Sequence, residues 1–466
     1  MKNIEFKQVE SCCTPILKDK RLSLRESVNQ GELHHLPVVI IGAGPIGLAA
    51  AAHLIEAGQS FIILESGTKV GENLSKWGHV RLFSPWQYNV DKAAVRLLTQ
   101  KGWIAPSPDE LPTGQELRDL YLLPLAKLPE IQTVLHLNTH VVGISRKNTD
   151  KMKTAGREKQ PFMIYVEQEG KSKRYEARAV IDASGTWGHA NPVLSSGLWT
   201  PGEKALHDQI YYGIPDVLGG DKERYTNKHI AVVGGGHSAL NTLLDLARLQ
   251  ELNSGIKLTW IMRRDRVEEA YGGESNDQLQ ARGELGRRIH ELVDSGKVNV
   301  VTPFHIQELK REGKRVTLVG EQHGVIREIA QVDEIIVNAG SRPDFSFLRE
   351  LRLSIDQTTE SVETLAPLID PNVHSCGTVR PHGEKELRHM EQGFYIVGMK
   401  SYGRAPTFLM ATGYEQVRSV VAFLAGDLEA AVKVELELPE TGVCMVNRPQ
   451  VQAADKKSDC SSSCSK

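Results

Sequence analysis

The sequence predicts an α/β fold with two Rossmann-like dinucleotide-binding domains, one inserted in the other. Two glycine-rich fingerprints stand about 190 residues apart, and each follows a short apolar run and precedes a helix-like stretch. Two strand ends of similar design, 179–185 and 332–342, flank the second fingerprint and finish in small residues. Small residues at a strand end let backbone pass close to a nucleotide or to a second domain. This order indicates that one nucleotide domain interrupts the other.

The first fingerprint reads Gly42-x-Gly44-x-x-Gly47 and follows the apolar run 38–41, which predicts a buried parallel strand. The first glycine allows a tight turn, the second lets backbone approach a pyrophosphate, and the third lets the helix expected over 48–57 pack on the strand. The pyrophosphate then lies at the positive end of the helix dipole. The candidate cofactor-binding residues of this turn are Gly42, Gly44, Pro45 and Gly47.

An acidic residue follows the next predicted strand, 61–64. This residue, Glu65, lies 23 positions after Gly42, where a carboxylate accepts hydrogen bonds from ribose hydroxyls. A nucleotide with a free 2′-hydroxyl therefore fits the first domain.

The second fingerprint reads Gly234-x-Gly236-x-x-Ala239, after the apolar run 230–233 and before a helix expected from about Ser238. Its partner strand, 258–262, is followed by two arginines instead of an acid. Guanidinium groups suit the 2′-phosphate of NADPH, which favours NADPH over NADH, although the two arginines would also suit a solvated loop. The candidate residues are Gly234, Gly236, His237, Ser238, Arg263 and Arg264.

The remaining chain divides around these fingerprints. A hairpin is expected from strands 139–144 and 162–166, with a charged tip between them, and a strand at 394–397 leads into a helix at 407–424. The expected divisions are an N-terminal arm at 1–35, a first nucleotide-binding domain at 36–190 and 331–440, a second at 191–330, and a cysteine-containing tail at 441–466.

Composition excludes several classes of partner. A net charge of −2 and a pI near 6.8 give no field suited to nucleic acid or anionic lipid. No apolar run approaches the roughly 18 to 20 residues that span a bilayer, and no signal peptide is evident, so we expect a cytoplasmic protein. The six cysteines do not indicate a disulfide framework, and no metal site is expected. The expected partners are a small-molecule substrate and dioxygen, and a homo-oligomer is left open.

Several motifs together resemble those of the two-dinucleotide flavoproteins. They are GAGPIG, the small-residue strand end near Ser184, GGGHSA, AGSRPD and the stretch 395–419. Within that superfamily the chain resembles the class B flavin-dependent monooxygenases, although the spacing from Gly202 to His207 departs from their signature. It resembles more narrowly the monooxygenases of arsenic-resistance operons, the ArsO and ArsV type, through residues 77–84, 398–404 and 438–444.

The resemblance implies FAD in the first domain and NADPH in the second. It also implies a monooxygenase that acts through a flavin C4a-hydroperoxide on a soft nucleophile, such as a trivalent organoarsenical like methylarsenite, to give the pentavalent form. Gly398, Met399 and Arg404 match the loop that contacts the flavin end of FAD in the family. The stretch after Glu65 is expected to pass the flavin ring, and its candidate wall residues, which are equally typical of a core, are Trp77, Arg81, Trp86, Tyr88 and Asn89.

Thiols are the last candidate group, because trivalent arsenicals bind thiolates as soft metals do. The candidates for substrate capture are Cys12, Cys13, Cys444, Cys460 and Cys464. Alternatively, these are exposed thiols without a role. Cys376 is expected to be a packing residue.

Two other enzymes remain open: an NADPH-dependent flavin disulfide or metal-ion reductase, and a monooxygenase of an amine or sulfur substrate. The reductase needs a cysteine pair beside the flavin, and residues 66–100 contain no cysteine. A non-enzymatic flavin sensor would need no NADPH site.

Overall fold

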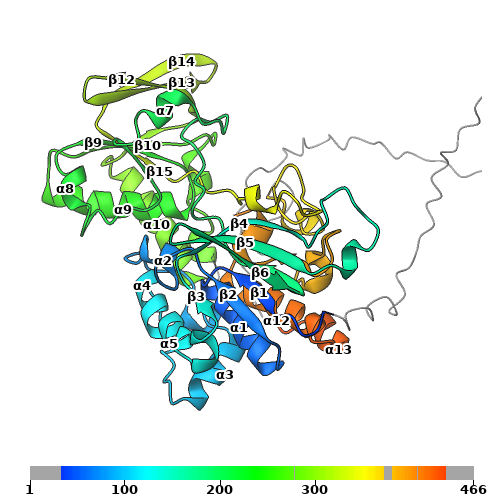
Figure 1. Ribbon diagram of the computed structural model, residues 1–466. Helices are drawn as coiled ribbons and strands as arrows, with labels where there is room; N and C mark the ends of the chain where they lie inside the picture. Colours follow the sequence, from blue (N-terminus) through cyan, green and yellow to red (C-terminus); the bar gives the residue numbers. More distant parts are fainter. Residues whose placement is uncertain (1–32, 278, 372–379, 407, 437–466) are drawn as a thin grey trace, which may run out of the picture.

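Two five-stranded parallel sheets organise the protein (Figure 1). The computed structural model describes residues 33–277, 279–371, 380–406 and 408–436. The first sheet has the order β16-β7-β1-β2-β3 and the second the order β11-β10-β9-β15-β8. All strands of the second sheet come between β7 and β16 of the first sheet in the sequence. The predicted α/β fold, with one nucleotide-binding unit inserted in the other, is therefore confirmed.

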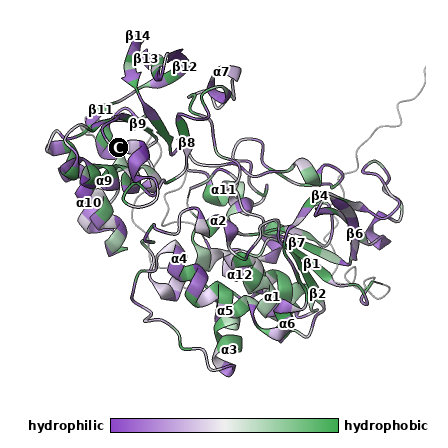
Figure 2. Ribbon diagram, turned by 60° about the vertical axis from the view of Figure 1, so that its left-hand side comes forward, coloured by the Kyte–Doolittle hydropathy of each residue, from purple (hydrophilic) through white to green (hydrophobic). Residues whose placement is uncertain are grey.

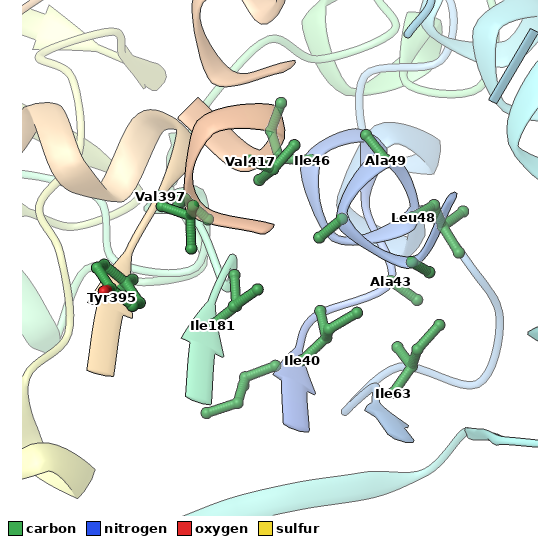
Figure 3. Close-up of a cluster of buried hydrophobic side chains, with 14 of the residues drawn as sticks. Ile40, Ala43, Ile46, Leu48, Ala49, Ile63, Ile181, Tyr395, Val397 and Val417 are labelled. Carbon is green, nitrogen blue, oxygen red and sulfur yellow. The ribbon is translucent and has the colours of Figure 1, made fainter. Parts of the chain in front are cut away.

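The first sheet is the core of the first unit. Its strands are β1 (Val38–Ile41), β2 (Phe61–Leu64), β3 (Leu135–His136), β7 (Ala179–Asp182) and β16 (Phe394–Ile396). Ile40 of β1 pairs with Ile63 on one side and Ile181 on the other, and all three side chains are fully buried. Figure 3 shows these side chains in one row under a helix that carries Ile46 and Ala49. The apolar runs therefore form central strands that are covered by helices.

Helices α1 (Pro45–Glu56) and α12 (Met410–Leu424) lie beside each other over this sheet (Figure 3). A methyl group on Gly413 of α12 would come within 2.5 Å of the Ile46 side chain, so the two helices pack closely. Their chain segments are more than 350 residues apart, which brings the end of the described chain back to its beginning. The other helices of this unit are α2 (Glu72–Ser75), α3 (Lys92–Gln100), α4 (Gly114–Leu117), α5 (Leu123–Ala126), α6 (Pro129–Gln132), α11 (Ala366–Ile369) and α13 (Leu428–Val432).

A three-stranded antiparallel sheet is attached to the first unit. It consists of β4 (Thr139–Arg146), β5 (Phe162–Gln168) and β6 (Lys171–Ala177), and β4 pairs with β5 as the predicted hairpin requires. Figure 2 shows β1, β2 and β7 as hydrophobic and β6 as hydrophilic, because most of β6 faces solvent. The hairpin prediction is therefore confirmed.

The second sheet consists of β8 (Ile210–Tyr212), β9 (His229–Val233), β10 (Lys257–Ile261), β11 (Asn299–Val301) and β15 (Glu334–Val337). Its unit also contains α7 (Pro201–Lys204), α8 (Lys222–Tyr225), α9 (His237–Leu252), α10 (Gln280–Asp294) and the antiparallel strands β12 (His305–Glu312), β13 (Arg315–Gln322) and β14 (Val325–Val332). Strand β15 pairs with β9 through Ile335 and Ile336. The second sheet therefore extends past residue 330, where the sequence analysis ends this unit, because the apolar strand 334–337 completes it.

Short 3-10 turns connect these elements: η2 (Trp86–Tyr88), η4 (Arg157–Lys159), η5 (Val267–Ala270), η6 (Glu274–Asn276), η7 (Ser346–Leu348), η8 (Glu384–Leu387) and η9 (Gly398–Tyr402), and η3 (Arg118–Leu122) is a π-helical turn. Within the described part of the chain, no helix is long and apolar enough to cross a membrane, and no three His, Cys, Asp or Glu side chains group as metal ligands do. Most of the predicted arm and tail lies outside the described residues. All six cysteines, including Cys376, also lie outside them.

Candidate functional site

The first glycine turn has the geometry that its fingerprint predicts. Gly42 has φ +99°, and a Cβ there would lie 2.8 Å from the carbonyl oxygen of Ala183, which a larger residue cannot tolerate. A Cβ on Gly47 would lie 1.9 Å from the Gly42 carbonyl oxygen, so α1 packs against the turn itself. Gly44 faces open space, and Pro45 begins α1. The N-terminus of α1 is therefore open to a pyrophosphate.

The carboxylate of Glu65 is held at the end of β2 by two backbone amides. Ala43 N–H donates to Oε2 at 2.6 Å, and Gly67 N–H donates to Oε1 at 2.7 Å. Each carboxylate oxygen keeps acceptor capacity for a ribose hydroxyl. The open turn and this fixed acid fit the adenosine side of a dinucleotide such as FAD.

The loop after β16 is fixed by a buried hydrogen-bond network that the sequence analysis did not identify. The Gly398 N–H donates to Gln416 Oε1 at 2.7 Å, and Gln416 Nε2 lies 2.9 Å from Ser401 Oγ and 3.0 Å from His382 Nε2. Burial lowers the pKa of His382, which keeps its ring neutral at pH 7. The signal for Gln416 in the sequence was a polar amide four residues before Val420, on the face that the apolar pattern predicts to be buried.

A buried ion pair joins the same loop to β7. Lys400 Nζ lies 2.7 Å from Asp182 Oδ2 and 3.1 Å from Ser184 Oγ, and neither charged side chain has exposed area. The Lys400 ammonium also lies 4.5 Å from the centre of the Phe347 ring. Removing one partner would leave an uncompensated buried charge, so this pair fixes η9 against the end of β7.

The five candidate wall residues have different surroundings. Trp77 is half-buried with its ring 6.0 Å from that of Trp187, and Tyr88 is also half-buried. Trp86 lies in the hydrophobic core with 4% of its surface exposed, and Asn89 is buried with its amide on the carbonyls of Ser84 and Pro85.

Arg81 is exposed and binds the Leu111 carbonyl, with Glu116 at 3.7 Å. The structure therefore does not bring the five candidates together. Trp86 and Asn89 are parts of the core because their side chains are used within it, and Trp77 and Tyr88 keep accessible surface.

The second glycine turn repeats the first. Gly234 has φ +132°, and a Cβ there would lie 2.3 Å from the Asn338 carbonyl oxygen of the segment after β15. Gly236 faces open space, Ser238 is half-buried in the first turn of α9, and Ala239 is fully buried against the core of this unit. The predicted similarity of the two small-residue strand ends is confirmed, because each passes beside one fingerprint.

His237 begins α9 beside residues of the other unit. Its ring lies 5.1 Å from the ring of Phe83, which belongs to the loop after α2. Burial, followed by the charge of Arg282, lowers the pKa of His237 to about 4. The ring of His237 is therefore neutral at pH 7.

Arg263 and Arg264 point in different directions. The Arg264 side chain lies against the fingerprint, since its Nε is 3.6 Å from the position of a Cβ on Gly235, and it donates to the Glu269 carbonyl. Arg263 donates to the carbonyl of Ser195 at 3.3 Å. Only Arg264 thus lines the second turn in this structure.

Arg404 is exposed on the returning loop, where its N–H donates to the Thr359 carbonyl at 2.8 Å, and the neighbouring Met399 is half-buried. Partial burial and the charges of Arg342 and Arg263 lower the pKa of the Arg404 guanidinium. Arg404 therefore lies among arginines from the other unit and from the connection between the units.

Comparisons with known proteins agree with this geometry. The pattern of the family described as pyridine nucleotide-disulphide oxidoreductase matches residues 39–375. The ferredoxin–NADP reductase of Thermus thermophilus is 23% identical over 347 residues, which are 74% of this chain and 85% of that protein. Ferredoxin–NADP reductase 2 of Latilactobacillus sakei is 23% identical over 369 residues, 78% of this chain and 90% of the relative.

Solved structures show the same fold. The bacillithiol disulfide reductase of Bacillus cereus has a TM-score of 0.61 at 18% identity, and the match covers 84% of this chain and 99% of the reductase. The FAD-bound cadaverine monooxygenase DfoA of Erwinia amylovora has a TM-score of 0.57 at 14% identity, and the match covers 91% of this chain and 99% of DfoA. With its two nucleotide turns, the chain binds FAD and NADPH and belongs to the pyridine nucleotide-disulphide oxidoreductase family.

Proposed function

We propose that this flavoprotein is an NADPH-dependent monooxygenase that oxidises a soft nucleophile, and that its substrate is a trivalent organoarsenical such as methylarsenite. The observation that carries the proposal is the distribution of cysteine: no described residue is a cysteine, and the sequence has none from 14 to 375. A dithiol reductase needs a cysteine pair beside the flavin. Electrons from NADPH therefore leave for an acceptor other than a disulfide within these units, and dioxygen is the acceptor we propose.

The assignment of an arsenical rests on the resemblance of 77–84, 398–404 and 438–444 to the monooxygenases of arsenic-resistance operons. Bound flavin supplies hydride acceptance from NADPH and the activation of dioxygen. The lone pair of trivalent arsenic accepts an oxygen atom without help from a protein acid or base. Methylarsenite, dioxygen, NADPH and a proton then give the pentavalent methylarsonic acid, NADP⁺ and water.

The chain's own residues have positioning roles in this proposal. The Gln416 network and the Lys400–Asp182 pair fix the loop from Gly398 to Tyr402, and half-buried Trp77 with Trp187 supplies an apolar wall that limits water. Glu65 and the first turn orient the adenosine part of FAD, and the second turn presents NADPH.

The test is oxidation of NADPH in air by the purified yellow holoenzyme, with and without methylarsenite, followed by chromatographic speciation of arsenic. We expect methylarsenite to accelerate NADPH oxidation and to accumulate as the pentavalent product. Unchanged methylarsenite would contradict the arsenical assignment, and lysine, cadaverine and a thioether in the same assay would then test amine and sulfur substrates.

A second candidate is an NADPH-dependent reductase, favoured by the relatives that carry the name ferredoxin–NADP reductase. This function needs no cysteine pair at the flavin. Anaerobic reduction of ferredoxin or of a disulfide by NADPH, at a rate above that of the aerobic reaction, would favour the reductase.

A further inference from the structure

A cavity of about 610 Å³ lies where the chain passes between the two units, and nothing above assigns a ligand to it. We call it the junction cavity, and its lining includes Lys76, Trp187, Trp199, Tyr212, Arg342 and Asp344. The two connecting segments run antiparallel beside it, since Arg342 N–H donates to the His189 carbonyl at 2.8 Å and Ala190 bridges to Ser341. The cavity is thus built from both units and from both connections.

Aromatic side chains form one part of its lining. Trp187 packs on Trp77 at 6.0 Å between ring centres, and a Cβ on Gly213 would contact the Trp187 ring at 3.4 Å. The rings of Trp199 and Tyr212 lie 5.2 Å apart, and the Tyr212 hydroxyl donates to Glu203 at 2.6 Å. Trp199 is 44% exposed, so it offers an open aromatic face beside a tyrosine that is held in place. Such a lining binds a planar apolar group.

Two cations, Lys76 and Arg342, lie in another part of the lining. Arg342 pairs with Glu360 at 3.3 Å through Nη2, but its buried Nε has no hydrogen-bond partner within the described chain. Lys76 donates only to the neutral Asn73 side chain, at 3.0 Å, among the hydrogen bonds of the described chain. Arg404 lies close enough to Arg342 and Arg263 for their charges to act on it.

One acid of the lining is already engaged. Asp344 accepts a hydrogen bond from the Ser346 N–H at 2.8 Å and lies 3.6 Å from His189. Burial opposes ionisation of Asp344, but the hydrogen bonds of Ser346 outweigh it and lower its pKa. Two cations of the lining, Lys76 and Arg342, therefore accompany one carboxylate of the lining, Asp344, which leaves positive charge for an anionic ligand.

We propose that the junction cavity binds the substrate through an anionic group held by Arg342 and Lys76 and through a planar body placed against Trp199 and Tyr212. The ligand class is an aromatic acid, that is, an oxyanion on an aryl group. This inference rests on the proposed function and narrows its substrate class: among trivalent organoarsenicals it predicts a preference, over methylarsenite, for one that carries an aryl group with an acidic substituent. The Arg342 side chain is 37% exposed, and a guanidinium matches an oxyanion by charge-assisted hydrogen bonds.

The binding test uses the FAD-loaded protein without NADPH and three probes: benzoate, benzamide and acetate. Isothermal titration should give benzoate a Kd about 10- to 100-fold below that of benzamide. This difference corresponds to the loss of one or two charge-assisted hydrogen bonds when the carboxylate is replaced by an amide. Benzoate should also bind more tightly than acetate, because acetate lacks the ring. Equal binding of benzoate and benzamide would overturn the proposal.

Variants locate the site. Arg342→Gln should abolish the preference for benzoate over benzamide, Arg342→Lys should retain part of it, and Lys76→Gln should weaken it less. Trp199→Ala should raise the Kd of benzoate and leave that of acetate unchanged. The matched control is Arg311→Gln on β12, an exposed arginine paired with Asp208, which should bind all three probes as the unaltered protein does. Lys76 and Trp199 are exposed, so their variants keep the test valid if Arg342→Gln does not fold.

Two competitors separate the possible outcomes. NADP⁺ also carries planar rings and phosphates, so displacement of benzoate by NADP⁺ would assign the cavity to the nucleotide and overturn the proposal. Turnover of phenylarsenite and 4-carboxyphenylarsenite separates this inference from the proposed function. Benzoate binding without oxidation of either arsenical would contradict the proposed function alone, whereas oxidation of both with equal KM would contradict the cavity assignment alone.

Discussion

The two nucleotide turns share a backbone design and differ in the side chains that surround it. In each, the first glycine has a positive φ and lies against a carbonyl of a neighbouring strand end, Ala183 for Gly42 and Asn338 for Gly234. The third position differs, because a Cβ at Gly47 would clash at 1.9 Å, whereas Ala239 fits its site in the second turn. At this third position the first turn is therefore the tighter of the two, whereas at the first glycine the second turn is tighter, with 2.3 Å against 2.8 Å to the carbonyl oxygen.

The residue after the second strand differs as well. Glu65 is fixed by two backbone amides, whereas Arg263 and Arg264 lie on opposite sides of the segment after β10. The chain bends at residues 263–265, just after β10. The backbone geometry of the two turns is thus alike, and we propose that the side chain beyond the second strand selects the nucleotide.

The largest expected effect comes from Gly47→Ala. Its Cβ cannot avoid the Gly42 carbonyl, so we expect loss of bound FAD and a free energy of unfolding lower by about 3 kcal/mol, as for severe overpacking. The opposite change in the second turn, Ala239→Gly, should cost only about 1 kcal/mol and leave the KM for NADPH nearly unchanged. Flavin absorbance per protein and urea denaturation measure both. Equal losses in the two variants would contradict the difference between the turns.

The second prediction concerns one histidine of lowered pKa in each unit. Burial lowers the pKa of His389 and of His237 to about 4, from 6.5. Between pH 6.5 and 4 the unfolded chain binds protons that the folded protein does not, so stability falls as pH falls through this window. His389→Gln should remove up to roughly 3 kcal/mol of that fall, and His237→Gln less, since His237 is only half-buried.

Urea denaturation at pH 7.5, 5.5 and 4.5 measures this effect. The exposed His305→Gln variant is the control and should follow the unaltered protein at each pH. A His389→Gln protein with the same pH dependence as the unaltered one would show that the ring is protonated in the fold.

Glu65→Gln comes third. The amide retains one acceptor oxygen, so one of the amides of Ala43 and Gly67 loses its partner and the ribose loses a charged acceptor. The Kd of FAD should rise about 10- to 100-fold, which is roughly 1.5 to 3 kcal/mol for a hydrogen bond to a charged group. Fluorescence titration of the apoprotein with FAD measures it, and an unchanged Kd would remove Glu65 from the site.

The smallest expected effect separates the two arginines. Together, Arg263→Ala and Arg264→Ala should raise the KM for NADPH about tenfold and leave the KM for NADH nearly unchanged. Singly, Arg264→Ala should account for most of the effect, because only Arg264 lies against the fingerprint. Steady-state kinetics with both nucleotides measure it, and equal effects on NADPH and NADH would leave no basis for the selection of NADPH.

The sequence was sufficient to predict the two units, because each fingerprint requires glycine for a local reason. It predicted that strand ends 179–185 and 332–342 have the same design, but it assigned the second to the first unit, since an apolar run does not state which sheet it joins. Trp86 and Asn89 show the same limit: residues of a wall and of a core have the same composition. The approach of Arg404 to Arg342 and Arg263 depends on tertiary structure and has no local signal.

In the proposed reaction, electrons from NADPH pass through the flavin to dioxygen, and one oxygen atom reaches a soft nucleophile. The direct measurement is the stoichiometry of NADPH, dioxygen and oxidised product in a closed cell, with methylarsenite as substrate and an anaerobic control. We predict one NADPH and one dioxygen consumed for each pentavalent product, and no product without dioxygen. Sustained oxidation of NADPH without dioxygen, coupled to reduction of a disulfide or ferredoxin, would contradict the account and identify a reductase.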